Sequence, residues 1–375
     1  MKILFTFLLT TLFLINDNTA ICQKSTDTTT KVVTITNMSL KDCYVTNKYI
    51  WILRGDGIIT RINPETHAIY DSLKFNKKIV SIGKSINDTI YAADDNGGIF
   101  RIFDNKDTNF LWNTNQIVQN FVFTSTNKCF LITEKGIYEP EQADRLYYEN
   151  AFSNGPMKHF NTFSWEPSST FIDKGDNIWL GFSAGEWGGD IVIFSTNDQR
   201  FIKFRERQKD FCYVRPVRSF FQNNSNIYAV TSLQHMSSIN SAIIEITDTC
   251  RYFFQSPVYK SNNIDEAENL YNKKEIYMGP AIFNSNDSSI YFYSQFGLFK
   301  GNIKKELSKL ENWQLVLKTK FMWYYGMPDA VGYGMNVSKM FFEGNKLFIV
   351  SPSNGILIWD GKQPVLLKTT YKPAD

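Results

Sequence analysis

The segment Asp176-Asn177-Ile178-Trp179-Leu180 contains a unit that recurs along the chain. It is a polar turn with Asn, Asp or Gly, followed by an aliphatic and aromatic strand. Six further copies are Asn47-Lys48-Tyr49-Ile50-Trp51-Ile52, Asn87-Asp88-Thr89-Ile90-Tyr91-Ala92, Asn127-Lys128-Cys129-Phe130-Leu131, Asn226-Ile227-Tyr228-Ala229-Val230, Ser289-Ile290-Tyr291-Phe292 and Asn345-Lys346-Leu347-Phe348-Ile349. The first copies recur every 40–50 residues or so, the period of a propeller blade, and the longer later intervals predict insertions.

Other short strands surround each unit. A strand that usually starts at glycine follows it, as in Gly57–Ile62 and Gly98–Ile102, and another precedes it, as in Ile79–Ile82. A fourth follows the glycine strand, as in Ala68–Tyr70. Four short strands per period with turn residues between them are typical of a blade. The sequence therefore predicts an all-β fold, a single seven-bladed β-propeller of four-stranded antiparallel blades over residues 41–370.

The unit that ends in Leu180-Gly181 resembles the N-x-W-x-G core of the periplasmic sensor propellers attached to bacterial two-component regulators. It is also similar to the looser YVTN and quinoprotein-like propeller repeats. The resemblance extends from about residue 40 to 370, but its motifs are short and degenerate, so it implies architecture only. Neither a transmembrane helix nor a kinase follows the propeller in this sequence, and a sialidase Asp-box is absent.

Composition excludes some partners. Of the 375 residues 43% are hydrophobic and 15% aromatic, which favours a large, sheet-rich core. The net charge is +3 and no run of Lys or Arg forms a stripe, so a nucleic-acid partner has little electrostatic support.

The N-terminus predicts export. Lys2 precedes the apolar run Ile3–Ile15, which is too short to span a bilayer and is typical of a signal peptide. We expect residues 1–22 to be removed and the mature protein to be secreted, periplasmic or at the cell surface, with no transmembrane segment left. Cys22 as a lipid-modified cysteine is the less favoured alternative, because Ile21 is bulky where a small residue is required. Residues 23–40 would then form a leader with one extra strand, 31–36, that could close the ring.

Four cysteines follow the signal peptide, namely Cys43, Cys129, Cys212 and Cys250. An even number in an exported protein permits disulfides, but these four are scattered and show no metal-binding spacing. Their disulfide state is open, and buried free thiols are the favoured interpretation.

Long segments predict a functional face. Insertions between the second and third strands of blades 4 and 5 are expected at 181–190 and 232–242. Extended connections between blades are expected at 152–168, 205–216, 256–278 and 320–336. Both kinds emerge on the same face, because antiparallel strands alternate in direction. Long loops on a rigid scaffold usually carry function.

These segments contain the candidate ligand-binding residues, which are Glu186, Trp187, Asp190, Tyr213, Arg215, Arg218, His235, Trp323, Tyr324 and Tyr325. The segment 185–190 is either a loop with Trp187 as a stacking platform or a tight turn with an aromatic plug. Arg215 and Arg218 could hold a carboxylate or sulfate, or form salt bridges with acidic loops. His235 lies on an insertion of the same face, where a surface hydrogen bond is the more common role of a lone histidine.

Two main functions remain open, beside a third in which the propeller is a purely structural or cell-surface scaffold whose loops leave no pocket. The first is a non-enzymatic binding propeller that recognises a glycan, peptide or protein through its aromatic loops. The alternative is an enzyme of the glycoside hydrolase or lyase type, with carboxylates drawn from Glu166, Glu186, Asp190 or Asp210. No catalytic motif is present, and we expect neither a cofactor nor a metal site.

Overall fold

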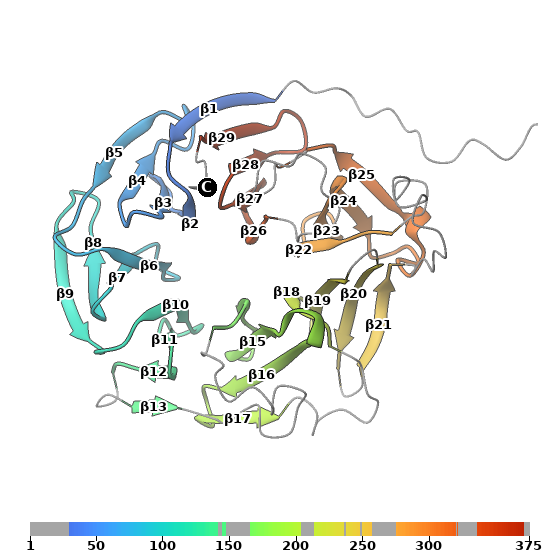
Figure 1. Ribbon diagram of the computed structural model, residues 1–375, viewed down its shortest axis with the longest axis horizontal. Helices are drawn as coiled ribbons and strands as arrows, with labels where there is room; N and C mark the ends of the chain where they lie inside the picture. Colours follow the sequence, from blue (N-terminus) through green and yellow to red (C-terminus); the bar gives the residue numbers. More distant parts are fainter. Residues whose placement is uncertain are drawn as a thin grey trace, which may run out of the picture.

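A computed structural model of the chain describes residues 30–141, 145–147, 166–203, 214–235, 238–247, 250–256, 275–319, 321 and 336–370. The side chains of Glu186, Lys203, His235 and Ser238 lie outside this description. Seven sheets stand around a common axis, as Figure 1 shows. The predicted all-β, seven-bladed propeller is therefore confirmed.

The first blades follow the chain without crossovers. Blade 1 contains β2 (Leu40–Val45), β3 (Ile50–Arg54), β4 (Ile59–Ile62) and β5 (Ile69–Leu73). Blade 2 contains β6 (Ile79–Lys84), β7 (Ile90–Asp94), β8 (Gly98–Ile102) and β9 (Thr108–Asn113). Blade 3 contains β10 (Val118–Phe123), β11 (Cys129–Thr133), β12 (Gly136–Glu139) and β13 (Arg145–Tyr147).

The remaining blades repeat this order. Blade 4 contains β14 (Ser169–Ile172), β15 (Asn177–Ser183), β16 (Gly189–Ser195) and β17 (Arg200–Lys203). Blade 5 contains β18 (Val217–Asn223), β19 (Asn226–His235), β20 (Ser238–Ile246) and β21 (Cys250–Gln255). Blade 6 contains β22 (Met278–Asn284), β23 (Ser289–Ser294), β24 (Gly297–Asn302) and β25 (Trp313–Leu317). Blade 7 contains β26 (Lys339–Glu343), β27 (Lys346–Ser351), β28 (Gly355–Trp359) and β29 (Val365–Thr369).

The turn between the first and second strands is built by the same chemistry in several blades. The side chain that opens the turn accepts a hydrogen bond from the backbone N–H four residues later, with Ser85 and Thr89 3.2 Å apart and Asp173 and Asn177 2.8 Å apart. The residue before that N–H has a positive φ, 58° at Asp88 and 59° at Asp176. Asp and Asn tolerate this conformation better than other side chains. The short polar turns of the repeat therefore fix the register of each inner hairpin.

The core lies between neighbouring blades rather than within one sheet. The second strand of each blade is largely buried on both faces, and all seven repeat aromatics are buried. Trp51, for example, packs with Ile59 of its own blade and with Ile82 and Ala92 of blade 2. Each blade thus supplies half of two cores, so the ring must be complete to bury them.

An additional strand closes the ring. Strand β1 (Lys31–Thr36) pairs in parallel with β29, which makes blade 7 five-stranded. Ile35 is buried in the core that blades 7 and 1 share, whereas Val32 on the same strand is 53% exposed. The predicted closing strand 31–36 is confirmed, and it is added outside a blade that already has four strands.

A histidine is buried beside this closure. His67, in the turn between β4 and β5, is 9% exposed, and neither ring nitrogen has a hydrogen-bond partner among the described residues. Its pKa lies below the ordinary value of 6.5 because it is buried and because Lys31 of β1 and Lys346 of β27 repel a further positive charge. The folded protein therefore holds His67 in its neutral form.

We expect this histidine to make the ring sensitive to acid. With a lowered pKa in the folded state, stability is full above pH 6.5 and is lost as the pH falls through the folded pKa. Replacing His67 by Asn, which tolerates its φ of 62°, should weaken this dependence. The measurement is the urea midpoint of both proteins between pH 8 and pH 5 or so. Equal losses in the two proteins would contradict the assignment.

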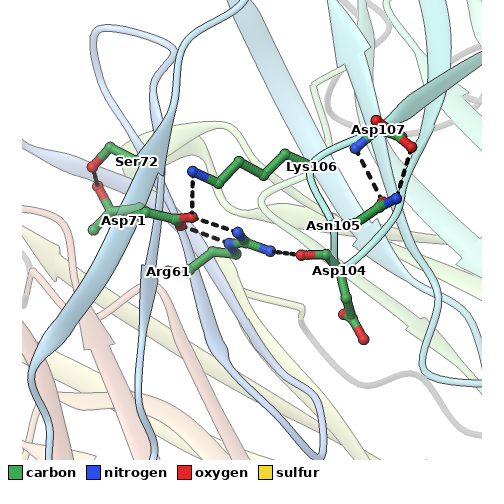
Figure 2. Close-up of polar contacts among 8 residues, drawn as sticks. Arg61, Asp71, Ser72, Asp104, Asn105, Lys106 and Asp107 are labelled. Atoms are coloured by element: carbon green, nitrogen blue, oxygen red, sulfur yellow. Dashed lines mark hydrogen bonds and ion pairs between the residues drawn. The ribbon is translucent and has the colours of Figure 1, made fainter.

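A fully buried arginine joins blades 1 and 2, as Figure 2 shows. The Nε and Nη2 atoms of Arg61 donate to the two carboxylate oxygens of Asp71 at 2.7 and 2.5 Å, and Nη1 donates to the backbone oxygen of Asp104 at 2.6 Å. Its guanidinium lies 4.6 Å from the ring centre of Tyr49 and 5.2 Å from that of Trp51. The ion pair raises the pKa of Arg61 and lowers that of Asp71. This polar contact binds the outer strands of blade 1 to the β8–β9 turn of blade 2.

The cysteines differ from one another. Cys43 and Cys129 are free and buried, as favoured, and burial raises the pKa of both thiols, so they are poorly reactive. Cys250 is disulfide-bonded. The expectation of free thiols was therefore wrong for Cys250.

Candidate functional site

The direction of the strands assigns each connection to one of two faces. The inner strands β2, β6, β10, β14, β18, β22 and β26 surround the axis in Figure 1. Turns from the first to the second strand, and from the third to the fourth, lie on one face, which we name the turn face. Turns from the second to the third strand, and connections between blades, lie on the opposite loop face. The candidate residues belong to the loop face.

The two insertions predicted in blades 4 and 5 are largely strand. Strands β15 and β16 pair from Asn177 and Ser195 as far as Ser183 and Gly189, and β19 and β20 pair as far as His235 and Ser238. The prediction of loops at 181–190 and 232–242 was therefore wrong. Most of these residues belong to the long hairpins β15–β16 and β19–β20. Ser183, Ser232, Asn240 and Ser241 are paired in these sheets, and the hydroxyls of Ser232 and Ser241 are 2.7 Å apart in a hydrogen bond.

The remaining connection in blade 4 is a tight turn. Residues Gly185–Trp187 form the 3₁₀ turn η2, which is closed by the bond from Ala184 N to Gly188 O at 2.8 Å. Gly185 and Gly188 have φ of 59° and 104°, where a side chain would be strained. A Cβ at Gly189 would lie 2.3 Å from the backbone oxygen of Arg215. The three glycines therefore allow a tight turn that the entry segment of blade 5 approaches closely.

Trp187 is presented at the end of this turn. Its side chain is 61% exposed, the most exposed of the large hydrophobic side chains among the described residues. The turn η2 lies against β19 of blade 5. The prediction of a tight turn at 185–190 therefore agrees with the structure. The prediction that Trp187 fills this turn does not, because its side chain is exposed.

Other candidates lie close by but are buried. Asp190 is 8% exposed, and its Oδ1 accepts the backbone N–H of Ile191 at 2.9 Å. Arg215 is 6% exposed, in a segment joined to blade 4 by the 2.9 Å bond from Gly189 N to Val214 O. The structure thus brings Trp187, Asp190 and Arg215 to the junction of blades 4 and 5, with only Trp187 well exposed.

Arg218 lies at the next junction, between blades 5 and 6. Its Nη2 donates to the backbone oxygen of Ser232 at 3.3 Å, and its guanidinium lies 5.3 Å from the ring centre of Tyr277. Burial raises the pKa of the Tyr277 hydroxyl, so that phenol stays neutral beside the arginine. Arg218 is partly exposed and has no carboxylate partner in the described part of the chain.

Several predictions lie outside the described residues. These are Tyr213, Trp323, Tyr324 and Tyr325, the side chains of Glu186 and His235, and most of the four connections between blades. Within the described ranges, no group of three or more His, Cys, Asp or Glu could hold a metal ion. No helix of the described part is long and apolar enough to cross a membrane.

Comparison with known proteins shows the fold. No family model matches the chain, and no curated protein matches it. Among solved structures, the chain is similar to YCF48 bound to D1 peptide, with a TM-score of 0.53 and 8% identity over 87% of this chain and 92% of that one. It is also similar to the β-propeller domain of Cps50 (Swd1) from Myceliophteria thermophila, with a TM-score of 0.53 and 11% identity over 88% of this chain and 99% of that one. At such identities the likeness concerns architecture alone.

Sequence reasoning missed a regular feature at the other end of the blades. The repeat aromatic is paired across the sheet with a charged residue in four blades, in the pairs Trp51–Arg61, Tyr91–Arg101, Tyr228–Glu245 and Tyr291–Lys300. A partial signal was present, because Arg101 and Lys300 each lie three residues after the glycine that begins their strand. These groups are structural, since Glu245 is buried and bonded to Tyr228 at 2.6 Å and paired with Arg251.

Proposed function

We propose that the protein is an exported, non-enzymatic binding propeller that recognises a glycan, peptide or protein through its loop face. The observation that carries the proposal is the exposure of Trp187 on a turn that glycines and neighbouring strands hold in place. An exposed indole on a rigid support offers contact area at little cost in conformational entropy.

Two further observations support parts of the proposal. The apolar segment after Lys2 has the form of an export signal, and the disulfide of Cys250 fits an oxidising compartment. YCF48, which has a similar fold, binds a D1 peptide, so the architecture is compatible with peptide recognition.

The alternative, a glycoside hydrolase or lyase, has less support. It requires two carboxyl groups facing a common substrate. Asp190 is buried and bonded to its own strand, while Glu166 is exposed where blade 4 begins. The resemblance of the repeat to sensor propellers likewise stays a prediction, and it concerns architecture only.

Replacing Trp187 by Ala should weaken ligand binding at least tenfold, because a central aromatic contact commonly contributes about 2 kcal/mol or more. The measurement is a glycan and peptide array screen with wild-type protein, followed by titration of any hit with both proteins. Phe110→Ala is the matched control, since Phe110 is 56% exposed on β9, the outer strand of blade 2. Equal binding by wild type and Trp187→Ala would refute the choice of site.

A further inference from the structure

The inner strands carry an uneven distribution of charge. Their described residues include four cations and two acids, namely Lys41, Lys84, Arg218, Lys339, Asp42 and Glu343. Lys339 donates to Asp42 at 2.9 Å, and Lys84 donates to Glu343 at 3.1 Å. Asp42 and Glu343 are thus each paired with a lysine. Lys41 and Arg218 are the two cations of the inner strands that neither acid pairs with.

The two remaining cations occupy the same position in the repeat. Lys41 is the second residue of β2 and Arg218 the second residue of β18, each at a break in the pairing with the next strand. Gln119 has this position in blade 3, where the same break occurs in β10. Because inner strands begin at the loop face, all three residues lie around the loop-face end of the axis.

Lys78, the residue before β6, adds a third cation. It lies close enough to Lys41 that it lowers the pKa of Lys41, together with burial, which acts more strongly. Neither lysine has an acidic partner among the described residues. We name Lys41, Lys78 and Arg218 the basic rim.

The basic rim also has unsatisfied hydrogen-bonding groups. The Nε of Arg218 and the Oε1 of Gln119 are shielded from water and have no hydrogen-bond partner within the described part of the chain. Buried polar groups are usually paired, so an unpaired donor and an unpaired acceptor at equivalent positions indicate a missing partner. Lys41 and Lys78 are like charges that lie close together with no acidic partner among the described residues, which indicates an anionic partner.

We propose that the basic rim binds an acidic peptide segment of the partner. This inference rests on the proposed binding function and names the chemistry of the ligand. Lys41 lies on β2 of blade 1 and Arg218 on β18 of blade 5. These two strands stand on opposite sides of the axis in Figure 1, with blades 2, 3 and 4 between them on one side. The ligand must therefore be extended and carry several negative charges. A polypeptide also offers backbone N–H groups for Gln119 and carboxylates for the fork of Arg218.

The test is fluorescence anisotropy with a labelled dodecapeptide of alternating Glu and Gly, and with a Lys and Gly peptide of equal length. Wild-type protein should bind the acidic peptide, with an affinity that falls as salt is added, and should not bind the basic one. The triple variant Lys41→Gln/Lys78→Gln/Arg218→Gln should bind at least tenfold more weakly. The matched control is Lys304→Gln/Lys305→Gln/Lys362→Gln, which changes the net charge equally on exposed turn-face residues and should bind like wild type.

Several results would overturn the proposal. The first is that wild-type protein does not bind the acidic peptide. The second is that the triple variant binds it as tightly as wild type does. The third is that the control variant weakens binding as much as the triple variant does. A sulfated oligosaccharide that binds more tightly than the peptide and depends on the same residues would assign the rim to glycans instead.

The double variant Lys41→Gln/Lys78→Gln leaves the contact of Arg218 with Tyr277 intact, so it tests the rim even if the triple variant misfolds. Binding that depends on Trp187 but not on the rim would refute this inference and leave the proposed function standing.

Discussion

Replacing Asp71 by Ala is expected to destabilise the protein by about 3–5 kcal/mol, because it leaves the fully buried guanidinium of Arg61 without its counter-charge. The two hydrogen bonds to the carboxylate are lost together, and Lys106, which lies 3.0 Å from Asp71, then adds a repulsive charge. Chemical denaturation followed by tryptophan fluorescence measures the change.

Two other variants make this result specific. Arg61→Met combined with Asp71→Leu removes both charges and should cost less than Asp71→Ala, since a buried ion pair can be replaced by apolar packing. Lys48→Gln removes an exposed ion pair with Asp104 in the same region and should leave the denaturation midpoint nearly unchanged. If Asp71→Ala were as mild as Lys48→Gln, Arg61 would not be an anchor between blades.

Replacing Ile35 by Asp should destabilise the protein by about 4 kcal/mol, because it removes a buried side chain and places a charge in the core that closes the ring. Strand β1 would then separate from β29 and expose its edge. Denaturation midpoints and the rate of proteolysis near residue 36 measure the effect.

The control for this change lies on the same strand. Val32→Asp puts the same charge on the exposed side of β1 and should change stability little. Equal losses from the two substitutions would show that the pairing of β1 alone, and not the burial of Ile35, closes the ring.

The repeat was predictable because each blade contains its own turn chemistry. Residues such as Ser85 and Asp173 specify the turn within five positions, and the strands beside them are short and apolar. Strand 31–36 was predictable for a similar reason, since its alternation and its β-branched residues are local. Local signals of this kind suffice to count blades.

Other features depended on contacts between distant residues. The polar segment near Ser232 looked like a loop in the sequence. In the structure, the hydroxyl of Ser232 forms hydrogen bonds with the hydroxyl of Ser241 and with the backbone of Met278 in blade 6. The disulfide of Cys250 likewise depends on distances that spacing alone does not give. The basic rim was missed because Lys41, Lys78 and Arg218 are far apart in sequence, and only the ring brings equivalent strand positions to one end of the axis.

The parallel pairing of β1 with β29 also determines how the protein should be immobilised. The chain enters β1 at Lys31, which bonds to Pro364 on the turn face, while β29 ends at Thr369 on the loop face. A linker fused ahead of residue 30 therefore attaches the ring by the side away from the basic rim and Trp187, and both stay accessible to a partner in solution. A tag fused beyond residue 370 leaves from the same side as the rim and would hinder its access. Sensor chips and affinity resins should accordingly be coupled through the N-terminal end.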